Sequence, residues 1–188
     1  MSNSDILMTL FGYPSKSEVQ AHFTLSQLKS MCVDVRLSDG RYITVHKAIA
    51  QDVAAALNAL IASGFKVDNT TYGWRSSANT SGGGYSFHNL GLAIDINCGS
   101  SSSKSLGWAH NPQFYIKQVS NDQIKANYDP KKDPLAIGVK QAAILSNYGL
   151  KWGRDFSSRP DIMHFSVGEV GTEGKNSWIS NLVEGANR

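Results

Sequence analysis

Hydrophobic and polar residues alternate over residues 33–45, a pattern typical of β-strands. Val33, Val35 and Leu37 are separated by polar residues, and residues 42–45 resume the alternation after Asp39-Gly40. A period of two places the apolar side chains on one face of a strand, and Asp-Gly is a common two-residue hairpin turn. We therefore predict an antiparallel hairpin in this part of the chain.

Two other segments carry apolar residues at helical spacing. Residues 47–64 are the longer of the two and end at Gly64, and residues 133–149 end in the same way at Gly149. Apolar residues three or four positions apart share one face of a helix, and glycine commonly ends one. We predict the first segment as the main core helix, the second as another amphipathic helix, and a further helix within residues 111–126.

The remaining strand-like segments surround these helices. Residues 65–75 are predicted as a strand that runs to Arg75, and residues 150–170 as two strands around a turn at Arg159-Pro160. Residues 91–97 alternate between a face of large apolar side chains and a face that includes Asp95. Because helices and strands are mixed without a regular βαβ alternation, we expect an α+β single domain, with a central, mainly antiparallel sheet flanked by helices.

Composition excludes several classes of protein. The chain has 188 residues, 41% of them hydrophobic, which is enough for one domain with a core. Its net charge is only +3 and it has no Lys/Arg-rich run, so we expect no nucleic-acid partner. No apolar stretch is long enough to span a bilayer, and no signal peptide is evident. Cys32 and Cys98 allow at most one disulfide, and we expect two free thiols.

Asp95 is a lone carboxylate in an apolar strand, with His88 just upstream. A buried charge is costly unless it is paired or bound to a metal. Zinc takes nitrogen, sulfur or carboxylate ligands, and a catalytic zinc site keeps one position open. His164 on the last predicted strand offers a third ligand. If Pro160 holds Asp161 in a turn, its carboxylate converges on the same place and can serve as a general base.

Taken singly, each of these histidines is also compatible with a structural role. Together they belong to the pattern S-x-H-x-x-G-x-A-x-D over residues 86–95, followed by D-x-x-H over residues 161–164. These motifs resemble those of the zinc D-Ala-D-Ala carboxypeptidases (VanY-type) and the related L-alanyl-D-glutamate endopeptidases of phage endolysins. That group shares a fold with the hedgehog N-terminal domain and the lysostaphin-type peptidases. The resemblance covers roughly residues 33–167.

The resemblance implies a role for each matching residue. His88, Asp95 and His164 would bind one zinc ion, and Asp161 would be the catalytic acid/base. Arg75 looks like the family's arginine that polarises the scissile carbonyl, with a surface strand arginine as the alternative. Ser86 matches a serine that contacts substrate or orients the site.

Other family features are altered or absent. In the segment "GLKWGRDF", Trp152 either lines the substrate cleft or lies in the core, while Arg154 and Phe156 depart from the family pattern. The family often has a glutamine soon after the arginine, and residues 76–84 contain none. The Ser/Gly-rich connection over residues 98–108 is either a substrate lid or a solvated loop.

The predicted function is hydrolysis of peptidoglycan stem peptides by a zinc metallopeptidase, most simply an L-Ala-D-Glu endopeptidase. The alternatives are a D-Ala-D-Ala carboxypeptidase and, from a different class, a zinc-binding recognition domain without activity. We expect a monomer with an N-terminal segment, residues 1–32, packing on the core, a zinc peptidase domain over residues 33–170 and a tail over residues 171–188. A phage endolysin or tail-associated protein acting on the bacterial cell wall, and a cytoplasmic enzyme trimming wall peptides, both fit this interpretation.

Overall fold

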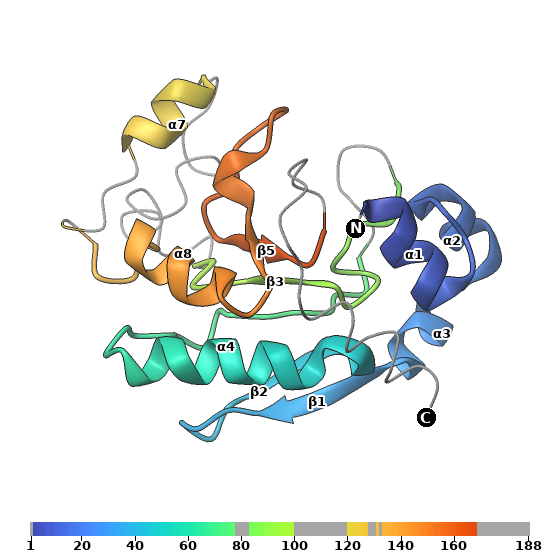
Figure 1. The fold of residues 1–188 in the computed structure, drawn as a ribbon, viewed down its shortest axis with the longest axis horizontal. Helices are drawn as coiled ribbons and strands as arrows, with labels where there is room; N and C mark the ends of the chain where they lie inside the picture. The colour runs from blue at the N-terminus through green and yellow to red at the C-terminus, as the bar shows by residue number, and fades with distance from the viewer. Residues whose placement is uncertain (1, 78–82, 100–119, 128–130, 132, 169–188) are drawn as a thin grey trace.

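A computed structural model describes the chain except for residues 1, 78–82, 100–119, 128–130, 132 and 169–188 (Figure 1). Most of the predicted lid or loop over residues 98–108, the first part of the helix predicted within residues 111–126 and the tail over residues 171–188 therefore lie outside the described residues. Helix α7 (Asn121–Asn127) overlaps the later part of that predicted helix.

The predicted hairpin and main helix are both present and pack on each other. Strands β1 (Cys32–Arg36) and β2 (Tyr42–His46) pair antiparallel, with Val33 opposite Val45. A short 3-10 turn, η1 (Lys47–Ile49), leads into α4 (Ala50–Ala62), which lies along the hairpin (Figure 1). Gly64, just after the helix, has a φ of +85°, a left-handed conformation that glycine adopts without steric cost.

A second, three-stranded sheet carries the residues of the candidate site. Strand β5 (His164–Ser166) lies between β3 (Ala93–Asp95) and β4 (Lys151–Trp152), and both pairings are antiparallel. Helix α8 (Val139–Ser146) packs against α4 and β4. The α+β class with antiparallel pairing is thus confirmed, and the pairing is divided between two small sheets.

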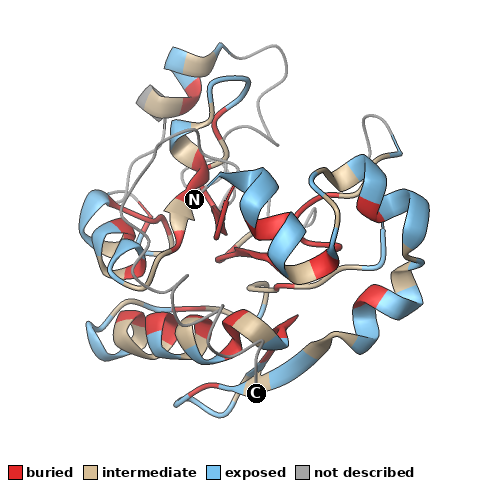
Figure 2. Cartoon of the chain, turned by 45° about the vertical axis from the view of Figure 1, so that its right-hand side comes forward, coloured by how far each residue is buried: buried red, intermediate tan, exposed pale blue. Residues whose placement is uncertain are grey.

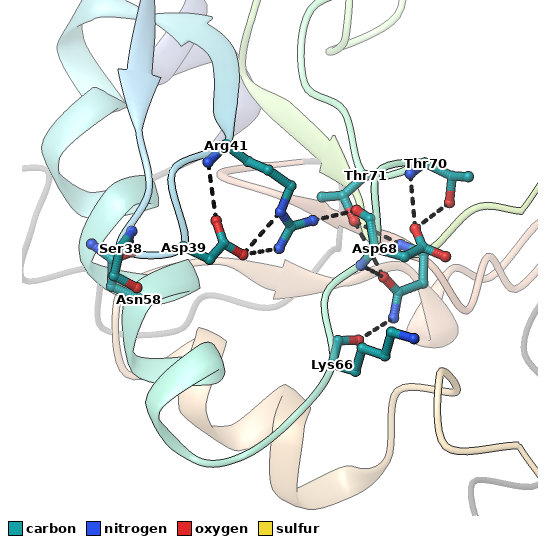
Figure 3. Close-up of polar contacts among 9 residues, drawn as sticks. Ser38, Asp39, Arg41, Asn58, Lys66, Asp68, Thr70 and Thr71 are labelled. Carbon is teal, nitrogen blue, oxygen red and sulfur yellow. Dashed lines mark hydrogen bonds and ion pairs between the residues drawn. The ribbon is translucent and has the colours of Figure 1, made fainter.

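The strand predicted over residues 65–75 does not form, apart from one isolated bridge between Tyr72 and Asp95. The reason is a polar turn before the bridge. The Asp68 side chain accepts a hydrogen bond from the backbone N–H of Thr70 (2.8 Å), and Arg41 donates to the Asp68 carbonyl oxygen (Figure 3). Side-chain bonds of this kind give the backbone an alternative to a strand ladder.

The strand predicted around Asp95 is also shorter than expected, because it ends at Asp95 itself. Two residues later, the fully buried Asn97 has a φ of +53°, a left-handed conformation that breaks the extended backbone. Its side chain accepts a hydrogen bond from the Asp68 N–H (2.7 Å) and donates to the carbonyl oxygens of Lys66 and Leu135. These bonds tie the end of β3 to the polar turn.

Three short helices precede the hairpin: α1 (Asn3–Phe11), α2 (Lys16–His22) and α3 (Leu25–Ser30). Each begins at a serine or threonine whose side chain accepts a backbone N–H, which is a favourable helix cap. Figure 2 shows buried residues on these helices as well as on the sheet strands. Their apolar side chains lie in the same core as those of α4 and β3. No helix in the described part of the chain is long and apolar enough to cross a membrane.

Candidate metal centre

Antiparallel pairing of β3 with β5 brings the two halves of the candidate site together. Asp95 at the end of β3 lies directly opposite His164 at the start of β5. His88 lies in a tight turn before β3, which is closed by hydrogen bonds from Gly91 N–H to His88 O (3.0 Å) and from Leu92 N–H to Phe87 O (2.8 Å). Gly91 has a φ of +70° in this turn, and this left-handed conformation explains why the first motif has a glycine at this position.

His88, Asp95 and His164 each direct one side-chain atom to a common point. The Nε2 of His88, the Oδ1 of Asp95 and the Nδ1 of His164 are 3.1 Å apart along every edge of the triangle they form. All three residues are buried. In a regular tetrahedron, ligands about 2.0–2.1 Å from zinc lie about 3.3 Å apart. Two imidazoles and one carboxylate at this spacing therefore fit a zinc ion with one position left over.

The ring orientation of His88 is fixed from the segment before the turn. Its Nδ1 lies 2.7 Å from the carbonyl oxygen of Gly73. Because a carbonyl oxygen can only accept, Nδ1 donates a proton to it, and Nε2 is the ring nitrogen that faces the other two candidate ligands. This arrangement, with the outer ring nitrogen donating to a backbone carbonyl, is typical of histidine ligands in metalloproteins.

Tyr72 contacts both His88 and Asp95. Its hydroxyl donates to Oδ2 of Asp95 at 2.6 Å, and its ring stacks on the His88 ring with centroids 5.1 Å apart. Burial and the neighbouring carboxylate raise the pKa of Tyr72 above its ordinary value, so the hydroxyl stays protonated. Burial alone would raise the pKa of Asp95, but His88 and His164 hold that pKa well below its ordinary value.

Asp161 follows Pro160 and directly precedes the bend that leads into β5. Its backbone N–H donates to the Gly153 carbonyl oxygen (2.9 Å), and its own carbonyl oxygen accepts from His164 N–H (3.4 Å). Gly153 fits closely here, because a Cβ on it would come within 3.0 Å of the Cβ of His164. Asp161 is half-buried, and the backbone hydrogen bond that its carbonyl oxygen accepts links it to the candidate ligand His164, three residues later.

Arg75 and Ser86 contact each other, and both are bound by Asn89, a residue that the sequence motifs did not indicate. The Arg75 guanidinium is 3.4 Å from the Ser86 hydroxyl. The fully buried Asn89 accepts from both the N–H and the hydroxyl of Ser86, and it donates to the carbonyl oxygens of Arg75 (3.0 Å) and Ser77 (2.9 Å). The amide of Asn89 thus joins the backbone around Arg75 to the turn that carries His88.

Trp152 lies in the core. It is 8% exposed, its indole N–H donates to the Ile162 carbonyl oxygen (2.7 Å), and its ring stacks on Phe165 with an interplanar angle of 3°. Of the two roles foreseen for this tryptophan, the core role is the one that these contacts describe, and its role in substrate binding stays a prediction.

The cysteines do not belong to the group of three candidate ligands. Both are free and half-buried, as expected. The Cys98 thiol donates to the Thr70 carbonyl oxygen (2.8 Å), and burial raises the pKa of each thiol to about 11. A thiol with so high a pKa is a weak nucleophile at neutral pH, which argues against a cysteine-peptidase site.

Most of the residues described above lie in a segment that is similar to a known protein family. A family model described as D-alanyl-D-alanine carboxypeptidase matches residues 79–167, just under half of the chain. The match contains Ser86, the three candidate ligands and Asp161, whereas Arg75 precedes it. No curated protein and no solved structure matches the chain. The family resemblance predicted from the two motifs is confirmed.

Proposed function

We propose that the protein is a zinc-dependent peptidase that hydrolyses peptidoglycan stem peptides, because residues 79–167 match a family model described as D-alanyl-D-alanine carboxypeptidase. The observation that carries the proposal is the buried triangle of His88, Asp95 and His164. These residues would hold one zinc ion, which supplies Lewis acidity and lowers the pKa of water to about 7.

In the proposed mechanism, Asp161 holds and moves the proton. Its carboxylate accepts a proton from the attacking water and later gives it to the leaving amine. Its place just before the bend that leads to His164 supports this role, because backbone hydrogen bonds to Gly153 and His164 hold the residue. A residue whose backbone is already held in place needs less reorganisation during the reaction.

Arg75 is proposed to stabilise the charge that develops on the scissile carbonyl oxygen. A guanidinium stays cationic at any physiological pH and costs no reorganisation when it is already fixed in place. Its contact with Ser86, two residues from His88, supports a position on the rim of the metal centre. Ser86 is proposed to orient this arginine or to contact substrate.

Two stem-peptide bonds remain as candidates for cleavage. The resemblance to phage endolysins favours the L-Ala-D-Glu bond, while the description of the matching family favours the terminal D-Ala-D-Ala bond. Digestion of defined muropeptides followed by mass spectrometry separates the two. An endopeptidase releases a fragment with a new amino-terminal D-Glu, whereas a carboxypeptidase removes one D-Ala. We propose the endopeptidase first, acting as a monomer on the bacterial cell wall.

The metal assignment is tested by changing its ligands. We expect His164→Ala to lose bound zinc and hydrolysis together, as measured by elemental analysis and by release of fragments from purified wall material. Full zinc occupancy in His164→Ala would refute the ligand set. Zinc binding by the wild type without hydrolysis of any wall peptide would favour the non-catalytic recognition domain instead.

A further inference from the structure

We propose that Tyr72 is a positioning residue of the metal centre, and that its hydroxyl determines which oxygen of Asp95 is presented to the metal. The inference rests on the proposed zinc site. The Tyr72 hydroxyl donates to Oδ2 of Asp95 at 2.6 Å, while Oδ1 is the oxygen that lies 3.1 Å from both His88 and His164. The two oxygens of one carboxylate thus have different partners.

This division matters because a carboxylate can bind a metal through one oxygen or both. An oxygen that already accepts a short hydrogen bond is a poorer ligand, so Tyr72 favours binding through Oδ1 alone. One oxygen and two imidazole nitrogens make the three-ligand set of a catalytic zinc site with an open position. Outer hydrogen-bond partners of this kind typically change metal affinity 10–100-fold when removed.

The backbone holds Tyr72 against Asp95 independently of the hydroxyl. The two residues form an isolated antiparallel bridge, with Tyr72 N–H donating to Asp95 O (3.0 Å) and Asp95 N–H donating to Tyr72 O (2.8 Å). The preceding turn is anchored as well, because Asn97 accepts from Asp68 N–H and Arg41 donates to the Asp68 carbonyl oxygen (Figure 3). Removing the hydroxyl should therefore leave the residue in place.

The same short segment also orients His88. The Tyr72 ring stacks on the imidazole with an interplanar angle of 29°, and the next residue, Gly73, accepts the Nδ1 proton of His88. Residues 72 and 73 thus contact two of the three candidate ligands. Both residues precede the segment that matches the family model, so the match assigns them nothing.

Substitution of Tyr72 by phenylalanine removes the hydroxyl and keeps the ring and its packing. We expect Tyr72→Phe to bind zinc 10–100-fold more weakly than the wild type, measured as a Kd by competition with a chelating dye. Tyr85→Phe is the matched control, since the Tyr85 hydroxyl donates to a backbone carbonyl oxygen of Phe23 (3.1 Å). The control should bind zinc with the wild-type Kd.

A second measurement separates positioning from a merely structural role. In the cobalt-substituted protein, Tyr72→Phe should show weaker visible absorption than the wild type, because the freed Oδ2 raises the coordination number. Melting of the metal-free proteins reports any structural effect. A wild-type Kd and cobalt spectrum in Tyr72→Phe, whatever its melting temperature, would overturn the inference and leave the zinc peptidase intact. If the wild-type protein binds no zinc, both the inference about Tyr72 and the proposed zinc peptidase are refuted.

Discussion

At the scale of single residues, the roles proposed for Asp161 and for the candidate metal ligands can be separated by experiment. Asp161 begins the turn that ends at His164, and it does not belong to the group of three candidate ligands. We expect Asp161→Ala to keep its zinc but to lose 10²–10⁴-fold in kcat/KM, the usual contribution of a general acid-base group. Elemental analysis and a wall-peptide hydrolysis assay measure the two quantities on one sample.

Asp155 offers the control for this prediction. It is an exposed aspartate in the 3-10 turn η2 (Gly153–Asp155), and its partner is the neighbouring Arg154 at 3.8 Å. Asp155→Ala should therefore keep both zinc and activity. A loss below tenfold in Asp161→Ala would remove Asp161 from the mechanism, and a loss of zinc would make it a ligand instead.

The residues of the site differ in how far sequence could predict them. His88, Asp95, Asp161 and His164 belong to motifs with fixed spacing, so their types and their order along the chain are enough to indicate zinc. Tyr72 and Asn89 belong to no such pattern. Tyr72 reaches Asp95 across 23 positions of the chain, and only the fold reveals that contact. The four hydrogen bonds of the Asn89 side chain likewise depend on where the segment around Arg75 runs.

At the scale of elements, the junction between β2 and α4 carries a pH-sensitive group. His46 ends β2, is buried, and accepts the Ala48 N–H at its Nδ1 (3.2 Å). Burial, helped by the charge of Lys47, lowers the pKa of His46 to about 4 from 6.5. The unfolded chain therefore binds a proton below pH 6.5 that the folded chain resists, and stability falls as the pH falls towards 4.

We expect this one histidine to cost the folded state about 2 kcal/mol between pH 7 and pH 5. Asparagine at this position can still accept the Ala48 N–H but does not titrate. Urea unfolding of metal-free wild type and His46→Asn at the two pH values isolates the effect. The wild type should lose more stability than the variant. Equal losses would show that the pKa of His46 is the same in the folded and the unfolded chain.

Elements in which apolar residues repeat with a clear period were predictable from the sequence, and the short elements were not. The hairpin and α4 follow from alternation and helical spacing in the sequence, and both form where expected. The segment over residues 65–75 has strand-like residues, yet the Asp68 side chain closes a turn and leaves only the bridge at Tyr72. That turn depends on Arg41 and Asn97, which are distant in sequence, so local propensity could not reveal it.

At the scale of the whole molecule, the candidate metal centre joins distant parts of the chain. His88 and His164 are separated by 76 positions and meet because β3 and β5 pair. The core around them includes α1, α2 and α3, whose residues precede the family match. A family motif could therefore indicate the candidate ligands, while the way in which the N-terminal helices complete the core depends on contacts that no motif encodes.

Zinc bound at this junction should stabilise the entire fold, because an unfolded chain does not hold the three ligand atoms together. At a free zinc concentration of about 100 times Kd, binding contributes about 2.7 kcal/mol, which corresponds to a Tm higher by roughly 5–10 °C for a chain of this size. Scanning calorimetry with added zinc and with a chelator measures the shift. His164→Ala is the control and should melt at one temperature in both conditions. Equal Tm values for the wild type would mean that the triangle holds no zinc in the folded protein.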